Sequence, residues 1–414
     1  MQQQESVSPV AKKRLGLVEF VALMATMTSL VALSIDAMLP ALDAIGEALH
    51  ANDASEAHLI VTLFFAGMAV GQLFFGPFAD TRGRRAAILL GLTIFVVGTL
   101  ICMSAQTMTT MLIGRVVQAF GVSGPRIAAM AIIRDLYVGD AMARVMSFIM
   151  MVFILVPMLA PIVGQTVLLF FSWPHIFSLF LIVAFLAGTW FFTRQSETLP
   201  RQRRQRFSFT RFLSSSKYIL THASVMGYTL AMGCIFGAFL AYLSASQTIF
   251  QGYYQAGKLF PFIFATLAFS IGIASFFNGQ MVMRFGMRTL CRVALVGVTV
   301  FAVIFNFILL SYAGLPPLWL TVMIMFTGFF FVGILFGNLN AMAMQPLGDM
   351  AGLGAAIIGS LSSLFSVPIA LFVDSFLNGT LYPIGLGFLV FFVLAGICVR
   401  MAERATPCSA NTDT

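Results

Sequence analysis

Charged residues are scarce in this 414-residue chain. Lysine, arginine, aspartate and glutamate together make up 9% of it, against about 25% in soluble domains. Hydrophobic residues make up 60%, more than the roughly 45–50% of soluble domains. Apolar runs of about 20 residues recur along nearly the whole length, as in helices that satisfy their backbone hydrogen bonds inside lipid. The sequence therefore predicts an all-α membrane protein and excludes a soluble globular domain.

Residues suited to metal binding or covalent catalysis are also few. The five cysteines have no C-x-x-C spacing and the four histidines have no ligand-like spacing, so neither a zinc site nor a disulfide framework is indicated. No G-x-S-x-G or Ser-His-Asp pattern is found. The segment from Gly252 to Lys258 resembles a phosphate-binding loop, but Leu259 stands where serine or threonine is required. We expect no metal, no cofactor and no enzymatic activity.

The apolar runs predict twelve transmembrane helices. Their expected ranges are 16–40, 57–79, 86–105, 109–133, 144–169, 173–193, 218–247, 259–282, 289–312, 317–343, 353–377 and 381–401. With the N-terminus inside, 20 of the 23 lysines and arginines lie on the cytoplasmic side, as the positive-inside rule requires. We therefore expect a multi-pass membrane protein with both termini cytoplasmic. This asymmetry accounts for the net charge of +8, so we expect contact with lipid and none with nucleic acid.

The chain divides into two similar halves. The polar stretch 194–217 carries seven basic residues and one acid, and it separates the sixth predicted helix from the seventh. Glycine and arginine recur at a spacing of 203 residues, in the pairs Gly76 and Gly279, Gly83 and Gly286, and Arg85 and Arg288. Parallel repeats of this kind are typical of transporters. We predict a six-helix half at 1–193, a cytoplasmic linker at 194–217, a second six-helix half at 218–401 and a cytoplasmic tail at 402–414.

Several motifs follow one another in an informative order. They are Ile35-Asp36-Ala-Met-Leu-Pro40, Gly76-Pro-Phe-Ala-Asp80-Thr-Arg-Gly83-Arg84-Arg85, Arg115-Val-Val-Gln118-Ala-Phe-Gly121, Arg134-Asp135-Leu-Tyr137, Pro157-Met-Leu-Ala-Pro161-Ile-Val-Gly164 and Phe239-Leu-Ala-Tyr242. With these motifs the chain resembles the major facilitator superfamily, and within it the drug:proton antiporters of the bicyclomycin/chloramphenicol-resistance branch. It departs from that pattern at Met38, where tyrosine is common, and at Ala160 and Gln165, where glycine is frequent.

The resemblance implies a function as well as a fold. It implies a monomeric, proton-coupled antiporter that exports lipophilic drugs, such as amphenicol- or bicyclomycin-like compounds, by alternating access. Its partners would be these drugs and protons. An importer of a small solute with the same fold is the alternative, and a membrane-embedded enzyme is a more distant one.

Asp36 and Arg115 are the candidates for proton coupling. An ionisable side chain within a transmembrane helix is costly and marks a functional site by default. Burial favours the protonated form of Asp36, whereas a nearby arginine favours the carboxylate. The resemblance implies that Arg115 shares a proton relay with this acid. The alternatives are that Asp36 reaches the outer interface and that Arg115 snorkels to a helix end.

The loop after the second predicted helix is a candidate conformational latch. Asp80 can accept hydrogen bonds at a helix end, Gly83 permits a tight turn, and Arg84 can reach Asp135 at the end of the fourth helix. Gly76 and Arg85 complete the motif. Such a cluster would hold the cytoplasmic side closed; the alternative is a set of solvated positive-inside charges.

Other candidates concern helix packing and the substrate. Pro157, Pro161 and Gly164 place kinked or small backbone on one side of the fifth helix, which favours a packed hinge against another helix, expected from the other half; plain proline kinking is the alternative. Four residues are candidates for the substrate cavity: Arg126, Tyr242, Asn338 and Asn340. Arg126 follows Gly124-Pro125 and either bonds freed carbonyls or faces the cavity. For Asp374 we expect an interfacial position.

Overall fold

The computed structural model describes residues 15–51, 54–137, 139–200, 202, 204 and 209–405. Its longer elements are α-helices, with the bounds α1 Leu17–Asp36, α2 Leu42–Ala48, α3 Ala54–Arg82, α4 Arg84–Met103, α5 Met108–Leu136, α6 Gly139–Phe170, α7 Pro174–Arg194, α8 Phe209–Thr221, α9 Ala223–Gln247, α10 Phe260–Phe285, α11 Met287–Ser311, α12 Leu318–Met344, α13 Ala351–Asp374 and α14 Tyr382–Ala405. Four short elements join them: η1 Leu39–Ala41, η3 Thr248–Tyr253, η4 Gly257–Leu259 and η5 Gln345–Met350.

The predicted all-α membrane fold is confirmed. Within the described ranges, eleven helices are long and apolar enough to cross a membrane, and the described part of α6 adds the shorter apolar stretch Leu155–Phe170. Each predicted span therefore has a helix at its place in the chain.

The first helix ends earlier than predicted. It stops at Asp36 rather than near residue 40, and the chain continues through η1 into α2. Pro40 explains the break, because a proline ring clashes with the carbonyl four residues before it and has no N–H to donate. That carbonyl belongs to Asp36, which therefore lies at the very end of α1.

The seventh predicted span also begins later, at Ala223 rather than 218. Residues Phe209–Thr221 form the separate helix α8, and His222 has a non-helical ψ of 101° between the two helices. The sequence of α8 mixes lysine, arginine and serine with leucine, isoleucine and phenylalanine, which suits a surface helix better than a membrane span. Residues 209–217 of the predicted linker are therefore helical.

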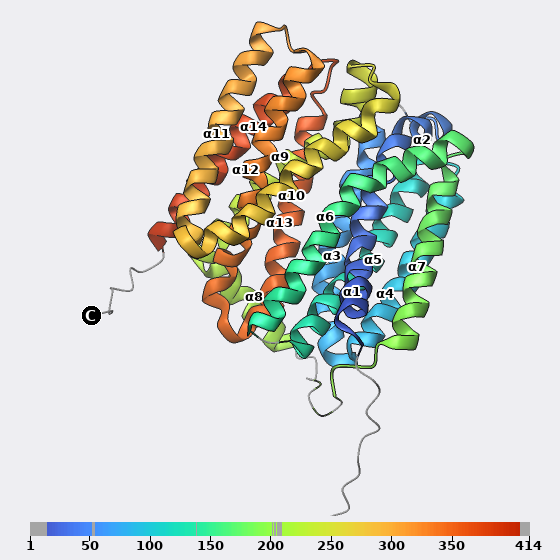
Figure 1. Cartoon of the computed structure of the whole chain (residues 1–414), viewed down its shortest axis with the longest axis vertical. Helices are drawn as coiled ribbons and strands as arrows, with labels where there is room; N and C mark the ends of the chain where they lie inside the picture. Colours follow the sequence, from blue (N-terminus) through green and yellow to red (C-terminus); the bar gives the residue numbers. More distant parts are fainter. Residues whose placement is uncertain are drawn as a thin grey trace, which may run out of the picture.

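The helices form two groups that lie side by side in Figure 1. The first group runs from α1 to α7, coloured blue to green, and the second from α9 to α14, coloured yellow to red. The groups meet where α3 packs against α13 and α6 against α10. We call the end of the bundle that carries α8 the linker end, and the opposite end, which carries α2, the far end.

The two groups share a local conformation at the repeated loop motif. Gly83, before α4, has φ 104°, and Gly286, before α11, has φ 76°. Positive φ values are readily adopted by glycine alone, so the glycines spaced by 203 residues make the same kind of turn in both groups.

Candidate functional site

Asp36 and Tyr242 are two buried polar residues from opposite helix groups. Asp36 ends α1 and is 6% exposed, and within the described part of the chain its carboxylate has no hydrogen bond and no ion pair. Tyr242 lies in α9, in the second group. That tyrosine is 1% exposed, and its hydroxyl has no hydrogen-bond partner among the described residues. Buried polar groups are nearly always satisfied. The Asp36 carboxylate can therefore still bind a proton, and the Tyr242 hydroxyl can still form a hydrogen bond with a ligand.

Arg115 lies in the same region but does not pair with Asp36. It is fully buried in α5. Its Nε donates to the Ile60 carbonyl of α3 at 3.1 Å, and its Nη1 donates to the Ser34 carbonyl of α1 at 3.1 Å and to Gln118. Its guanidinium lies 4.3 Å from the centre of the Phe64 ring, while Nη2 has no partner among the described residues.

Arg115 therefore connects three helices and reaches Asp36 only through the end of α1. The guanidinium is turned inward, as predicted, and its acceptors are neutral carbonyl and amide oxygens. Ser34 precedes Asp36 by two residues, so the hydrogen bond from Arg115 to its carbonyl fixes the last turn of α1.

Gly164 brings α6 into contact with that same turn. A Cβ atom at this glycine would overlap the carbonyl oxygen of Ala37, the residue after Asp36. Pro161 is buried one turn earlier and Pro157 is half-buried. We expected this small-residue face to pack against the other half. For Gly164 that expectation is wrong, because its close neighbour belongs to α1 of the same group; α6 does contact α10 elsewhere.

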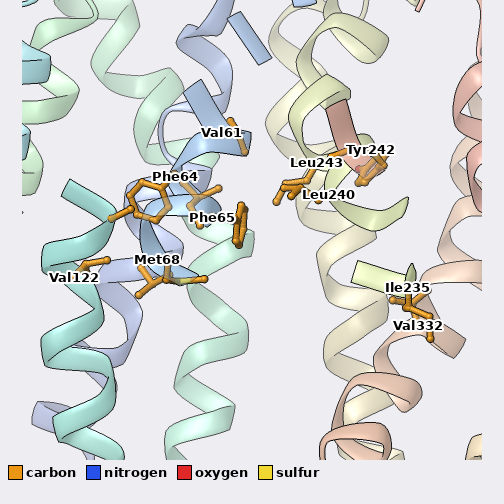
Figure 2. Close-up of a cluster of buried hydrophobic side chains, with 14 of the residues drawn as sticks. Val61, Phe64, Phe65, Met68, Val122, Ile235, Leu240, Tyr242, Leu243 and Val332 are labelled. Atoms are coloured by element: carbon orange, nitrogen blue, oxygen red, sulfur yellow. The ribbon is translucent and has the colours of Figure 1, made fainter. Parts of the chain in front are cut away.

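Aromatic and aliphatic side chains line the contact between the groups near Tyr242. In Figure 2, Phe65 of α3 points toward α9, and Leu240 and Leu243 point back toward it. The Phe65 ring lies 5.1 Å from the Phe236 ring of α9. Further ring contacts continue into α12: Phe236 with Phe336, Phe239 with Phe336 and Phe329, and Tyr242 with Phe329.

The remaining cavity candidates have different environments. Arg126 is exposed, and its Nη1 donates to Met68 Sδ at 3.2 Å. Asn338 is buried and donates to Asn278 Oδ1 at 2.7 Å, whereas Asn340 is exposed. Arg126 thus presents a positive charge to solvent from α5.

The predicted latch residues come together at the linker end. Arg84 is 3% exposed and donates from Nε to Asp135 Oδ2 at 3.0 Å and from Nη1 to Asp80 Oδ1 at 2.6 Å. Gly83 forms the turn before it, and Arg85 donates to the Phe192 carbonyl. Gly76 contacts α13, because a Cβ there would lie 3.3 Å from Ala356. The charged cluster itself connects α3, α4 and α5, all in the first group.

Glu197 completes this cluster and was not among the predicted site residues. Its two carboxylate oxygens accept the backbone N–H groups of Arg84 and Arg85 at 3.0 and 3.1 Å. An anion at a helix N-terminus is stabilised by the free N–H groups and by the helix dipole. The signal in the sequence was a lone acid within the basic stretch 194–217.

Asp374 is not interfacial, contrary to our expectation. It is 2% exposed at the end of α13, because α13 packs there against both α3 and α9. Its Oδ2 accepts from Ser244 Oγ at 2.8 Å and lies 3.8 Å from Nδ1 of His58 in α3. Asp374 is therefore a second buried acid at the contact between the groups.

Comparison with known proteins agrees with this architecture. The chain matches the family model of the Major Facilitator Superfamily over residues 24–370. The chain belongs to this superfamily. It is 30% identical to an uncharacterized MFS-type transporter of Bacillus subtilis, covering 86% of this chain and 88% of that one. It is also 30% identical to a bicyclomycin resistance protein homolog of Haemophilus influenzae, covering 82% and 85%, and 26% identical to a chloramphenicol resistance protein of Pseudomonas aeruginosa, covering 85% and 84%.

Solved structures of the superfamily share the fold. The xylose transporter XylE of E. coli, in a partially occluded inward open conformation, matches with a TM-score of 0.73 at 11% identity, covering 96% of this chain and 99% of that one. The human organic anion transporter MFSD10 matches with a TM-score of 0.63 at 18% identity, covering 94% and 100%. Family and fold together indicate a transporter rather than an enzyme, as predicted.

Proposed function

We propose that this protein is a proton-coupled antiporter that exports lipophilic drugs across the bacterial inner membrane. The halves 1–193 and 218–401 would alternate between openings to the two sides. Relatives covering more than four fifths of the chain are named for bicyclomycin and chloramphenicol resistance, which supports a role in drug efflux. The linker end is cytoplasmic in this proposal, because the basic residues gather there.

The observation that carries the proton coupling is the environment of Asp36. It is a buried carboxylate, without a hydrogen bond in the described part of the chain, at the contact between the halves. Separation of the halves would hydrate it and favour the carboxylate, whereas closure around it would favour the protonated acid. A bound proton would thus cross with the change of conformation. Arg115 keeps the acid in place by holding the Ser34 carbonyl.

The chemistry of the surrounding surface favours a lipophilic substrate with a polar group. Phe65, Phe236 and Phe239 offer aromatic faces at the contact between the halves. Tyr242 offers a free hydroxyl and Arg126 a positive charge. Apolar surface with a few polar groups is typical of ligand sites, and an exposed guanidinium favours neutral or anionic compounds over cations.

Two measurements on one pair of variants test this function. Expressed in a pump-deficient bacterium, the wild-type protein should confer resistance to amphenicols or bicyclomycin-like compounds, and the purified protein should release protons when the drug binds. Asp36→Asn should abolish both effects, because an amide keeps the shape of the side chain but does not exchange a proton. Asp43→Asn is the matched control, since Asp43 is an exposed acid in α2. Proton release and resistance that survive in Asp36→Asn would assign the coupling to another residue.

A further inference from the structure

A buried histidine and a buried acid from opposite halves meet at the far end of the bundle. His58 of α3 and Asp374 of α13 are each 2% exposed, and Nδ1 of the histidine lies 3.8 Å from Oδ2 of the acid. Nε2 of His58 lies 3.0 Å from Thr248 Oγ1, and Asp374 Oδ2 accepts from Ser244 Oγ at 2.8 Å. The other oxygen, Oδ1, has no partner among the described residues.

These contacts belong to a polar seam that joins the halves at this end. Gln247 of α9 donates from Nε2 to the Pro40 carbonyl at 3.1 Å, and its Oε1 accepts from the backbone N–H of Asp43 at 3.1 Å. The seam consists of hydrogen bonds and one ion pair between α3, η1 and α2 on one side and α9, η3 and α13 on the other. Opening the far end requires these contacts to break.

Other ionisable groups lie on the elements packed around this seam. They are Glu56 on α3, Asp43 and Glu47 on α2, His50 just after α2, Asp36 at the end of α1, Tyr242 on α9, Tyr253 and Tyr254 at the end of η3, Lys258 on η4 and Tyr382 on α14. Among the described residues, His58 is the basic group within ion-pair distance of Asp374. Glu56, two residues before His58, is the neighbour that a test must control for.

We propose that His58 and Asp374 form a proton-binding site, distinct from Asp36, whose occupation by one proton stabilises closure of the far end. With one proton the pair is an imidazolium and a carboxylate, which is neutral overall. Both ring nitrogens then carry a proton: Nε2 donates to Thr248 Oγ1 at 3.0 Å, and Nδ1 lies at the ion-pair distance of 3.8 Å from Asp374 Oδ2. Without that proton, the closed seam would bury an unbalanced negative charge. With a second proton, it would bury an unbalanced positive charge. Either unbalanced charge is costly away from water.

Linkage gives the sign of the expected pH dependence. When the far end is open and hydrated, an imidazole loses its proton near pH ~6.5 and a carboxyl group near ~3.9. Above about pH 6.5, closure must take a proton from solution, so the ratio of closed to open molecules should fall by up to about tenfold per pH unit. The proton is bound and released on the far side, extracytoplasmic in the proposed orientation, so it regulates closure without crossing the membrane.

The experiment measures closure directly in the full chain. Spin labels at Gln106, between α4 and α5, and at Leu315, between α11 and α12, report the distance across the far end by double electron–electron resonance. Both positions are exposed, and the native cysteines are replaced. The protein is reconstituted in lipid nanodiscs, and the populations are measured between about pH 6 and pH 8, the range in which the imidazole titrates.

Four variants separate the site from its neighbours. In the parent chain the closed population should fall as the pH rises. Asp374→Asn should abolish or reverse this fall, because closure would then bury a lone imidazolium. The double variant His58→Gln with Asp374→Asn should show a clearly weaker pH dependence than the parent, because only the contribution of Asp36 remains, and it should still fold because amides replace both charges. Glu56→Gln should leave the fall unchanged, and Asp36→Asn should keep the part of the fall that His58 and Asp374 contribute.

The outcomes are decisive in each direction. A parent chain whose closed population does not change with pH, or a double variant that keeps the parent's pH dependence, would overturn the proposal. Loss of the fall in Asp36→Asn would likewise overturn it and assign the titration to the coupling site. This inference rests on the proposed alternating access but not on drug export. If the closed population falls with rising pH but the protein exports no drug, only the proposed substrate is refuted.

Discussion

Substitution of Gly164 by alanine should disturb the candidate coupling site without changing any charge. The added Cβ would overlap the carbonyl oxygen and carbonyl carbon of Ala37, and backbone atoms cannot rotate away as the end of a side chain can. Overpacking of this kind costs roughly 1–3 kcal/mol, and the involvement of backbone places Gly164→Ala near the upper limit. A loss of about 3 kcal/mol corresponds to a change of more than about a hundredfold in the folding equilibrium.

Gly188→Ala is the matched control for this substitution. Gly188 lies in α7 of the same half, and the nearest atom to an added Cβ is Leu92 Cδ1 at 3.1 Å, the tip of a flexible side chain. Unfolding by SDS in mixed micelles should show a clear loss of stability for Gly164→Ala and little for Gly188→Ala, and drug efflux should fall only in the first. Wild-type stability and efflux in Gly164→Ala would refute the close contact of α6 with the end of α1.

Three further outcomes are expected. Asp80→Asn removes one carboxylate from Arg84 and should reduce transport in vesicles. Drug affinity should stay unchanged, because the cluster lies at the linker end. An equal loss of affinity would point to a direct role of Asp80 in drug binding. Glu197→Gln removes a charge from the N-terminus of α4 and should lower the free energy of unfolding by about 0.5–1 kcal/mol, less so at high salt. Arg115→Lys keeps the positive charge but cannot donate to three helices at once, so efflux assays should find it inactive; near-normal efflux would show that charge alone suffices.

The transmembrane architecture could be predicted because it follows from composition over long windows. Twenty apolar residues in a row have few alternatives to a membrane helix, and the described helices fall where the sequence placed them. The contact of Arg84 with Asp135 was predictable for a similar reason. Arg84 begins α4 and Asp135 lies in the last turn of α5, so both lie at the linker end, and motif order fixes which helices are neighbours.

The details of the site depended on packing between distant segments, which a hydropathy pattern does not encode. Gly164 was identified as a packing residue, but its partner Ala37 was not, since small residues indicate close approach without indicating the partner. The early end of α1 could have been inferred from Pro40, because proline excludes a helical carbonyl at Asp36. That inference was missed when the apolar run alone set the boundary.

Asp374 shows why position along a helix is insufficient to judge a buried acid. Near the end of an apolar run it looked like a residue at the lipid interface, whereas α3 and α9 enclose it and bring His58 to within 3.8 Å. An acid at a helix end is interfacial only when no neighbouring helix extends past it, and here both neighbours do. Asp36 also ends its helix and is also enclosed, yet it has no basic partner within ion-pair distance among the described residues. The two acids therefore differ in what a proton does for them. At Asp36 a proton neutralises an unpaired carboxylate, which suits a group that exchanges its proton during transport, whereas at Asp374 the paired imidazole makes a single proton the condition for closing the seam.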